Sequence, residues 1–244
     1  MSVAAGRWNR AQAFIAQQPA AVGRPDNVAE MLRRICGAAV NALPATGAGV
    51  SVMTHNGTRG FAVASDPSSQ QFEELQFTLG EGPCVDAFAA GRPVLVPDLS
   101  DGAMTRWPMY APAVHAHGVR AVFAFPLQVG AARLGVLDVF REQPGQMSEE
   151  ELAQALTFAE IAVVTVLDGQ NNAPPGAMPE GFTQAPGFRA EISQAQGMIM
   201  VQLGVTLAEA LVRLRAYTYA EGRPIGDVAR DVVARRLRFD ETQP

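Results

Sequence analysis

Residues 120–142 read RAVFAFPLQVGAARLGVLDVFRE, two apolar runs on either side of a short segment that contains Gly130. Both runs are rich in valine and phenylalanine, which are favoured in strands, and a short glycine-containing segment between them is typical of a hairpin. An earlier stretch, residues 47–65, alternates apolar and polar residues about Asn56–Gly57, the strongest short hairpin signal. Together the two stretches predict an antiparallel sheet.

Helical patterns accompany both hairpins. Residues 27–43 carry apolar side chains at helical spacing, which predicts a helix with one buried face. Residues 148–169 open with Ser148 and Glu151, a capping-box pattern, and continue as an apolar helix. Two further helical pieces are expected between the hairpins. The order helix, hairpin, helices, hairpin, helix predicts an α+β fold in which helices flank an antiparallel sheet.

A stripe of apolar residues within 148–169 steps by four and three residues, the a/d spacing of a coiled-coil seam. The stripe consists of Leu152, Leu156, Ala159, Val163 and Val166. One interpretation is a dimer seam, and another is a helix packed on its own sheet. A mixture also fits, with one stripe on the sheet and another on a partner chain.

Residues 171–187, NNAPPGAMPEGFTQAPG, are dense in proline, glycine and asparagine and have no apolar period, which is typical of a linker. They separate a larger body from a tail. Up to residue 185 there are 11 arginines and 17 acidic residues, whereas residues 186–244 hold 8 arginines and 7 acidic residues. The chain has no lysine. The tail is therefore the less acidic part without being strongly basic.

Composition narrows the class of protein. With 48% hydrophobic and 18% charged residues, the chain can bury a core, which excludes disorder throughout. Cys36 and Cys84 are too few for a disulfide framework and lack metal-ligand spacing. The N-terminal residues contain no apolar run long enough for a signal peptide or membrane anchor. We therefore expect a cytoplasmic protein with no membrane association.

The tail contains three short helical patterns. Gly204 ends the first, and Thr206 with Glu209 forms a capping box that opens the second. Pro224 stands at the first turn of the third. Gly197 interrupts the first pattern, although glycine costs about 1 kcal/mol relative to alanine inside a helix. Close approach of another helix would offset this cost, and the alternative is that Gly197 is merely tolerated.

The body resembles a GAF domain over residues 27–169. The resemblance lies in LGEGPCVDAFAAGRPVLVPDL (residues 79–99) and in residues 106–140. The GEGPC element is similar to that of GAF domains that actinobacterial proteins carry ahead of an RNA-binding tail. The resemblance implies a sensor domain that holds a small molecule between the sheet and its helices, with the ligand or cofactor unknown. Aromatic residues that either line such a pocket or fill the core are Trp107, Tyr110, Phe123, Phe125 and Phe140.

Cys84 is the candidate sensor residue. It follows GEGP and lies near the start of a predicted helix, where the thiolate form is favoured. A redox- or ligand-sensing cysteine is one interpretation. The other is a small buried apolar residue, because cysteine is among the most buried residue types.

The tail, residues 187–240, resembles the ANTAR domain, and residues 170–186 form the linker. The string ISQAQGMIMVQLGVTLAEALVRLRAYTYAEGRPIGDVARDVV (residues 192–233) carries the resemblance. The matching positions are Ala195, Gly197, Met200, Ala210, Leu214, Arg215, Asp227, Val228 and Ala229. Two positions depart from the family pattern, because Gln196 stands where lysine is usual and Thr218 where alanine is common. The resemblance implies a homodimer that binds RNA stem-loops in transcription antitermination.

By matching positions, the resemblance implies an RNA-facing set. It consists of Gln196, Arg215, Tyr219 and Arg223, with Arg189, Arg235 and Arg236 as further candidates for phosphate contact. Loss of the usual lysine charge at Gln196 is expected to weaken binding and its salt dependence. The alternative for each arginine is a solvated charge or an intrahelical pair, such as Glu209 with Arg213.

Enzymatic activity is not expected. The sequence contains three histidines, His55, His115 and His117, and no carboxylate is spaced with them as a metal-ligand set. LGEGP lacks the ending of a phosphate-binding loop. We expect a signal-responsive, RNA-binding antitermination regulator. The alternative is a protein-interaction or redox-signalling module whose tail dimerises or docks on a protein without RNA.

Overall fold

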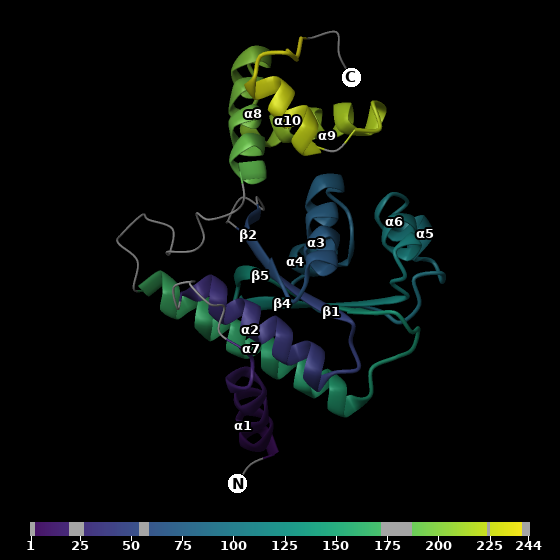
Figure 1. Cartoon of the computed structure of the whole chain (residues 1–244), viewed down its shortest axis with the longest axis vertical. Helices are drawn as coiled ribbons and strands as arrows, with labels where there is room; N and C mark the ends of the chain where they lie inside the picture. The colour runs from purple at the N-terminus through teal and green to yellow at the C-terminus, as the bar shows by residue number, and fades with distance from the viewer. Residues whose placement is uncertain (1–2, 20–26, 54–58, 172–186, 224, 241–244) are drawn as a thin grey trace. The chain divides into compact units, whose positions relative to one another are not determined.

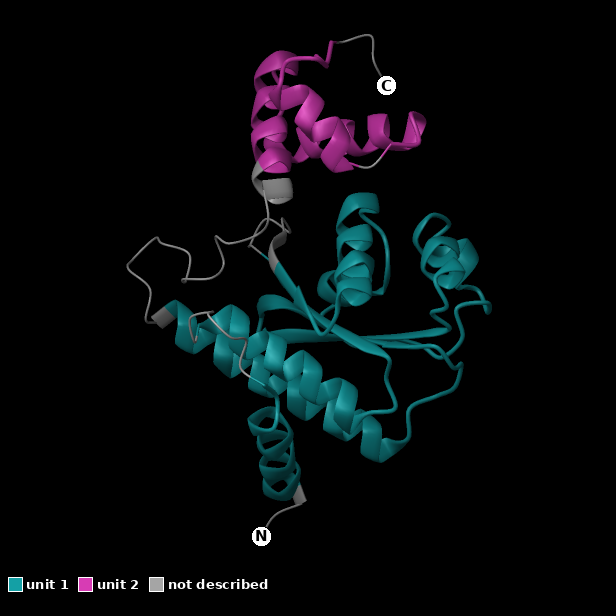
Figure 2. Cartoon of the chain, viewed as in Figure 1, with its two compact units in different colours: residues 1–183 teal, residues 184–244 magenta. Residues whose placement is uncertain are grey.

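The computed structural model describes residues 3–19, 27–53, 59–171, 187–223 and 225–240. The chain divides into two compact units, Met1–Thr183 (unit 1) and Gln184–Pro244 (unit 2), coloured separately in Figure 2. Of the predicted linker, residues 170 and 171 belong to the last helix of unit 1, and residues 172–186 lie outside the described residues.

Five strands in the described part of unit 1 form one antiparallel sheet in the order β2-β1-β5-β4-β3 (Figure 1). Their bounds are β1 Gly47–Met53, β2 Arg59–Ala64, β3 Val94–Val96, β4 Ala121–Val129 and β5 Ala132–Arg141. Both predicted strand pairs are confirmed, while the turn at Asn56–Gly57 lies outside the described residues. Strand β3 was not predicted, because three residues are too few to show an alternating pattern.

Helices cover both faces of the sheet. They are α1 Val3–Ala16, α2 Val28–Ala42, α3 Pro67–Leu79, α4 Pro83–Ala90, α5 Ala103–Arg106, α6 Tyr110–Ala116 and α7 Glu149–Asn171. Helices α2 and α7 lie side by side on one face, and α3 to α6 lie on the other (Figure 1). The segment between the hairpins thus holds four described helices, and the expectation of two was wrong.

Strand alternation divides the apolar residues between two cores. Phe123 and Phe125 of β4 point into the core beneath α2 and α7, whereas Phe140 of β5 points to the opposite side. Trp107 and Tyr110 belong to that second core. All five aromatic side chains are buried, and because the sheet separates them they do not line one pocket.

Helix α1 begins ahead of the residues predicted for the first domain. It packs against α2 and α7, and Ala11 and Ile15 are buried there. The core of unit 1 therefore includes residues upstream of residue 27.

Helix α7 begins with the predicted capping box. The Ser148 backbone N–H donates to Glu151 Oε2 (2.7 Å), and the Glu151 N–H donates to Ser148 Oγ (3.2 Å). By length and hydropathy, residues 149–170 could cross a membrane, but half of the helix is buried inside unit 1. This burial is typical of the core helix of a folded domain.

The predicted seam of α7 does not form one exposed stripe. Ala159 and Val166 are buried in the core of unit 1, and Leu152 and Val163 are partly buried against it. Leu156 is 40% exposed. Most of the stripe therefore packs on the chain's own unit, as one of the three interpretations expected, and a dimer contact through α7 stays a prediction.

In the described residues of unit 2, three helices surround a small core: α8 Gly187–Leu203, α9 Leu207–Ala220 and α10 Ile225–Val233. Gly204 ends α8 with a φ of 65°, a left-handed conformation that glycine adopts without strain. Thr206 and Glu209 form the predicted capping box of α9. Pro224 lies outside the described residues.

The explanation proposed for Gly197 was wrong. A Cβ built at Gly197 would meet no described atom within 4 Å, leaving aside its chain neighbours and its own helix backbone. No helix of unit 2 therefore approaches closely at this position. Ala195, two residues earlier, is fully buried and does lie in the helix contact.

Candidate functional site

A buried polar cluster lies on the α3–α6 side of the unit 1 sheet. Its members are Ser51 of β1, Glu73 and Gln76 of α3, Cys84 of α4 and Asp138 of β5, and none is more than 1% exposed. Gly49 of β1 faces Asp138 in the sheet register. The alternation of β1 and β5 places Ser51 and Asp138 on the side where valine and phenylalanine fill the rest of the core.

The GEGPC element forms the connection between α3 and α4. Gly80 ends α3 with a φ of 70°, and Pro83 occupies the first turn of α4, where its missing N–H costs nothing. Glu81 Oε1 accepts the backbone N–H groups of Met109 (2.7 Å) and Tyr110 (2.8 Å), which fixes the start of α6. The element therefore determines where Cys84 stands.

Hydrogen bonds orient the side chains of the cluster. Ser51 Oγ donates to Glu73 Oε2, and Gln76 Nε2 donates to Asp138 Oδ2 (2.9 Å). The Cys84 backbone N–H donates to Gln76 Oε1 (2.7 Å). Through Gln76, the position of α4 is thus tied to the carboxylate on β5.

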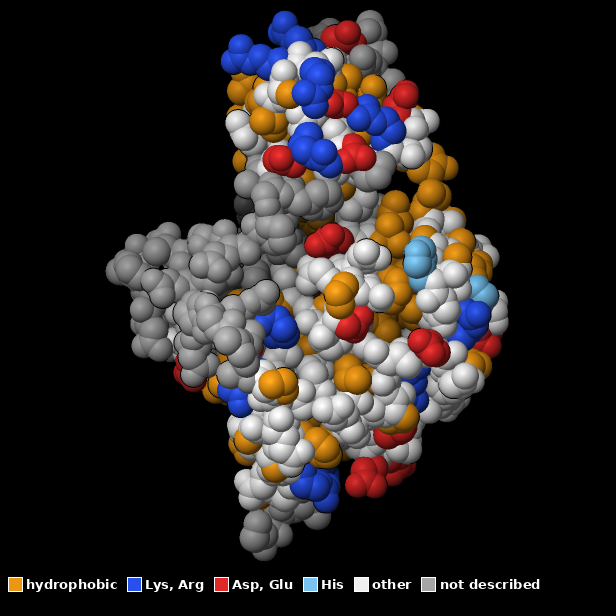
Figure 3. Space-filling model, in the orientation of Figure 1, with side chains coloured by type: hydrophobic (Ala, Val, Ile, Leu, Met, Phe, Trp, Pro, Cys, Tyr) orange, Lys and Arg blue, Asp and Glu red, His pale blue; other side chains and the backbone are white. Residues whose placement is uncertain are grey.

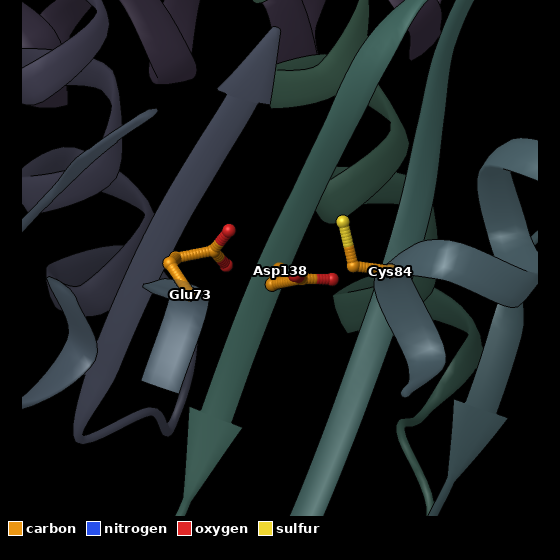
Figure 4. Close-up of side chains that lie close together, drawn as sticks. All are labelled: Glu73, Cys84 and Asp138. Carbon is orange, nitrogen blue, oxygen red and sulfur yellow. The ribbon is translucent and has the colours of Figure 1, made fainter. Parts of the chain in front are cut away.

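Three side chains of the cluster carry atoms that are able to bind a metal ion, and these atoms lie close together. A carboxylate oxygen of Glu73, the Cys84 sulfur and a carboxylate oxygen of Asp138 all lie within 4.8 Å of one another. In Figure 4, Asp138 on β5 stands between Glu73 and Cys84. The three come from a helix, a second helix and a strand, so the tertiary fold brings them together.

Two glycines leave room for the cluster. A Cβ at Gly49 would lie 2.6 Å from Glu73 Cγ, and a Cβ at Gly82 would lie 2.5 Å from Gln76 Oε1. Gly82 also has a φ of 132°, a conformation that L side chains rarely adopt. Larger residues at either position would displace the polar side chains.

The sequence analysis missed Glu73, Gln76 and Asp138 and expected no metal site. One signal was present, because Asp138 interrupts the apolar run GVLDVF at a position that strand alternation places inside the fold. An acidic residue at such a position is rare and needs a partner. No spacing in the sequence connects it with Cys84.

Cys84 occupies the first turn of α4 and is buried. Cys84 thus has both the place near a helix N-terminus on which the sensor interpretation depends and the burial that the other interpretation expected, and its role as a sensor stays a prediction. Cys36, in α2, is the matched buried cysteine, and burial, together with the nearby charge of Glu73, raises its pKa. Cys36 therefore stays a thiol at neutral pH.

In unit 2, helix α9 presents a stripe of exposed and partly exposed side chains. Val212, Arg215 and Tyr219 are spaced by three and four residues and therefore share one side of the helix. Val212 is 60% exposed and Tyr219 is 64% exposed. Arg215 is partly buried, and burial lowers its pKa, although a guanidinium stays charged at neutral pH.

Gln196 lies inside unit 2. It is 8% exposed, and its Nε2 donates to the backbone carbonyl of Leu207 (2.6 Å), which links α8 to the first turn of α9. Thr218, the other departure from the ANTAR pattern, is equally buried, and its hydroxyl donates to the Leu214 carbonyl (2.7 Å). Both departures thus make polar contacts within the helix bundle.

Asp231 of α10 holds two of the candidate arginines. Arg223 Nη2 lies 2.6 Å from Asp231 Oδ2, and Arg236 donates to Asp231 Oδ1 from Nε (2.8 Å). The hydrogen bond from Arg223, and then that from Arg236, holds the pKa of Asp231 below its ordinary value. The carboxylate is therefore ionised at neutral pH, and the two guanidinium groups are fixed beside each other.

Two further basic candidates for phosphate contact are Arg189 and Arg235. Arg189 lies in α8, but its side chain is outside the described residues, and Arg235 has a φ of 59°, the left-handed region. Glu209, the alternative partner of Arg213, accepts hydrogen bonds from Thr206 as part of the capping box. On the face of unit 2 that Figure 3 shows, basic and acidic side chains are interspersed, without a uniform basic patch.

Comparison with known families gives a match in each unit. The model of the GAF domain matches residues 25–167, and the model of the ANTAR domain matches residues 182–233. The first match includes the sheet and the polar cluster, and the second includes α8, α9 and α10. No curated protein matches the sequence.

Solved structures that are similar to this chain at low sequence identity include GAF domains. The GAF domain of a phosphoenolpyruvate-protein phosphotransferase from Coxiella burnetii is 17% identical with a TM-score of 0.52, over 70% of this chain and 98% of that one. The corresponding domain from Acinetobacter is 13% identical with a TM-score of 0.49, over 70% and 97%. Free methionine-R-sulfoxide reductase from Neisseria meningitidis is 17% identical with a TM-score of 0.47, over 71% and 95%. Of these three, the Coxiella burnetii structure has a TM-score above 0.5, and at 17% identity it supports the fold of unit 1 and nothing about its function.

Proposed function

The chain belongs to the GAF domain family and carries an ANTAR domain after its GAF domain, and from this premise we propose that it controls transcription by antitermination. In this proposal the GAF domain receives a signal and the ANTAR domain binds RNA stem-loops as part of a homodimer. GAF and ANTAR domains are sensory and regulatory domains, so the chain is a signal-responsive regulator. The signal itself, a small molecule or a redox change, is open.

The observation that carries the RNA proposal is the stripe of Val212, Arg215 and Tyr219 on α9, within the matched ANTAR residues. Unpaired bases in RNA loops stack on aromatic rings and guanidinium planes, and phosphates attract arginine. An exposed tyrosine beside an arginine supplies both kinds of contact. The pair of Arg223 and Arg236, fixed by Asp231, adds positive charge in a defined geometry.

Gln196 takes a different role in this proposal from the one implied by the resemblance. Its amide is committed to the Leu207 carbonyl and is nearly buried, so we propose that it positions α9. RNA contacts then come from the helix that it positions. Arg189 and Arg235 stay candidates for phosphate contact.

A homodimer requires a surface on each copy. We propose that α7 contributes through its outward side, where Leu156 and Val164 are exposed, rather than through the buried residues of the predicted seam. Beside Leu156, the α1 residues Arg7 and Trp8 line a shallow groove together with Glu160. Because α7 also packs on β4 and β5, a change on the sheet can alter this surface.

The proposal also covers the location of the protein, its domain bounds and its sensor residue. We propose a cytoplasmic protein of the actinobacterial GAF-ANTAR type, with a GAF domain at residues 27–169, an ANTAR domain at residues 187–240, and a linker between them that begins after Asn171, the last residue of α7. Cys84 is the candidate sensor residue in unit 1, because it is tied through Gln76 to the carboxylate of Asp138. The Cys84 sulfur itself lies within 4.8 Å of carboxylate oxygens of Glu73 on α3 and Asp138 on β5, so a chemical change at the sulfur would act on both elements.

The test is a binding titration of the full chain against a pool of paired-hairpin RNAs with randomised loops, at low and physiological salt. Tyr219→Ala should weaken binding roughly 5- to 150-fold, the range expected for one lost stacking contact of about 1–3 kcal/mol. Tyr219→Phe is the matched control, because it keeps the ring and should keep most of the affinity. Binding should weaken steeply with salt, since phosphate contacts release counterions.

Two results would contradict the RNA proposal. One is absence of binding at low salt by a chain whose folding is verified by circular dichroism. The other is binding that is insensitive to salt and to Tyr219→Ala. Either result would favour the second candidate function, docking of unit 2 on a protein.

One observation favours that second candidate. Large apolar or aromatic side chains are exposed on unit 2, namely Val201, Leu207, Val212 and Tyr219. Val212 and Tyr219 share one side of α9, and exposed apolar groups that lie together mark protein-interaction surfaces. A protein partner bound through them would show weak salt dependence and a negative heat-capacity change on binding.

A further inference from the structure

We infer that the polar cluster of unit 1 is a binding site for a divalent first-row transition metal ion, with Glu73, Cys84 and Asp138 as its protein ligands. Their donor atoms lie within 4.8 Å of one another, and all three side chains are buried. The inference goes beyond the proposed function and does not depend on RNA binding.

The geometry is close to that of a metal centre. An ion about 2.0–2.3 Å from sulfur and oxygen ligands in tetrahedral arrangement places the ligand atoms about 3.3–3.8 Å apart. The donors of Glu73, Cys84 and Asp138, within 4.8 Å of one another, would draw closer together around a bound ion. The side chains come from α3, α4 and β5, so binding would join two helices to the sheet.

Electrostatics favours a cation at this point. Two carboxylates and a thiol that converge in a buried place repel one another when more than one is charged. A proton or a cation between them relieves this repulsion. The third group at the same point, the sulfur of Cys84, is as thiolate the donor that a transition metal prefers.

The donor types narrow the class of ion. Thiolate is a ligand for Zn²⁺ and for iron or cobalt in the divalent state, whereas Mg²⁺ and Ca²⁺ take oxygen ligands in larger numbers. Three protein ligands leave a fourth position open, as in metal sites that also bind water or a small molecule. The set thus fits a borderline divalent ion and disfavours hard cations.

The surrounding residues resemble the outer partners that orient metal ligands. Ser51 holds Glu73, and Gln76 holds Asp138 while it accepts the Cys84 N–H. Gly49 and Gly82 leave the space that Glu73 and Gln76 occupy. These hydrogen bonds and the space at the two glycines are observations separate from the convergence of the donor atoms, and they support the same site.

The experiment uses the full chain, reduced and treated with a chelator, and Co²⁺ as the probe. One equivalent of Co²⁺ should produce the thiolate-to-cobalt charge-transfer absorption, Zn²⁺ should abolish it by displacement, and excess Mg²⁺ should leave it unchanged. Cys84→Ser should lose the absorption, and Cys36→Ser, which alters the other buried cysteine, should keep it. Co²⁺ is added both to folded protein and during refolding, because the ligands are buried.

Glu73→Gln and Asp138→Asn change charge with little change of shape. Each should weaken Co²⁺ binding at least about tenfold, since loss of an outer partner alone costs about 10- to 100-fold. These two variants decide the question if Cys84→Ser does not fold. The inference is overturned if the wild type shows no absorption, if the absorption survives Cys84→Ser, or if both carboxylate variants bind as the wild type does.

The metal inference and the RNA proposal fail separately. A chain that binds Co²⁺ at the cluster but ignores hairpin RNA would keep the first and lose the second. A chain that binds RNA but not Co²⁺ would do the reverse.

Discussion

At the scale of single residues, burial decides which of the predicted contacts are available to a ligand. Gln196 was expected to face RNA but donates its amide to the Leu207 carbonyl inside unit 2. Tyr219 was expected at the same surface and is 64% exposed. Both residues were chosen because they match positions of the ANTAR pattern. That match did not show that Gln196 is buried between two helices whereas Tyr219 faces solvent.

Asp231 supplies a test at this scale. It is an acidic residue in a proposed RNA-binding surface, so its removal should tighten RNA binding if only net charge matters. It also holds Arg223 and Arg236, and we expect that Asp231→Ala weakens hairpin binding about three- to tenfold because both guanidinium groups lose their fixed orientation. The measurement is the same RNA titration at two salt concentrations.

Asp227→Ala is the matched control. It removes one negative charge from the same helix, but its partner is Arg230. We expect RNA binding that is unchanged or slightly tighter. If Asp231→Ala binds as Asp227→Ala does, Asp231 contributes charge alone and does not position the arginines.

At the scale of elements, helix α7 shows how one segment serves two surfaces. Its inward side, with Phe158 and Ala162 fully buried, packs against the sheet and α2. Leu156 and Val164 are exposed on the remaining side. The heptad-like stripe predicted from the sequence lies mostly on the inward side, with Leu156 at its exposed edge, because a period of 3.5 residues and a period of 3.6 residues differ little over a few turns.

The dimer proposal can be tested at Leu156. We expect that Leu156→Glu, which places a charge on the outward side of α7, raises the dimer dissociation constant at least about tenfold by burying an uncompensated charge at the interface. Sedimentation velocity over a concentration series measures the change. Val129→Glu is the control, because Val129 is 50% exposed at the end of β4.

The outcome distinguishes two kinds of dimer. Dissociation of the Leu156→Glu dimer, with an intact control, places the interface on α7. A dimer that survives the Leu156 substitution would show that the contact is made elsewhere, and the exposed apolar residues of unit 2 would be the next candidates.

At the scale of the whole molecule, two units with separate cores carry separate tasks. Unit 1 contains the sheet and the polar cluster, and unit 2 contains the three described helices with the α9 stripe. Each unit buries its own apolar residues, such as Leu137 in unit 1 and Leu214 in unit 2, both fully buried. Domains that bury independent cores commonly unfold in separate steps, so we expect two unfolding transitions for this chain.

Calorimetry tests this independence. Leu214→Ala should reduce the free energy of unfolding of unit 2 by about 2–5 kcal/mol, the cost of lost burial and a cavity, and leave the other transition in place. Leu137→Ala should reduce the free energy of unfolding of unit 1 by a similar amount and leave the transition of unit 2 in place. A single transition that moves with both substitutions would show that the two units unfold together.

The sequence by itself determined the strand pairs, helices α2 and α7, the three helices of unit 2, the capping boxes at Ser148 and Thr206, and the presence of GAF and ANTAR domains, but not helix α1. These features depend on local periodicity, turn chemistry and motif strings, all of which are present in neighbouring residues. It did not predict β3 or the number of helices between the hairpins, because those elements are too short to repeat a period.

Only the tertiary structure brought together Glu73, Cys84 and Asp138, which are far apart in the chain. Their convergence depends on the register of β1 with β5 and on the packing of α3 and α4 against that sheet. The burial of Gln196 and the outward position of Tyr219 likewise follow from how α8, α9 and α10 pack. Neither can be read from spacing, because the face of a helix that becomes buried is decided by its partners and not by its own period.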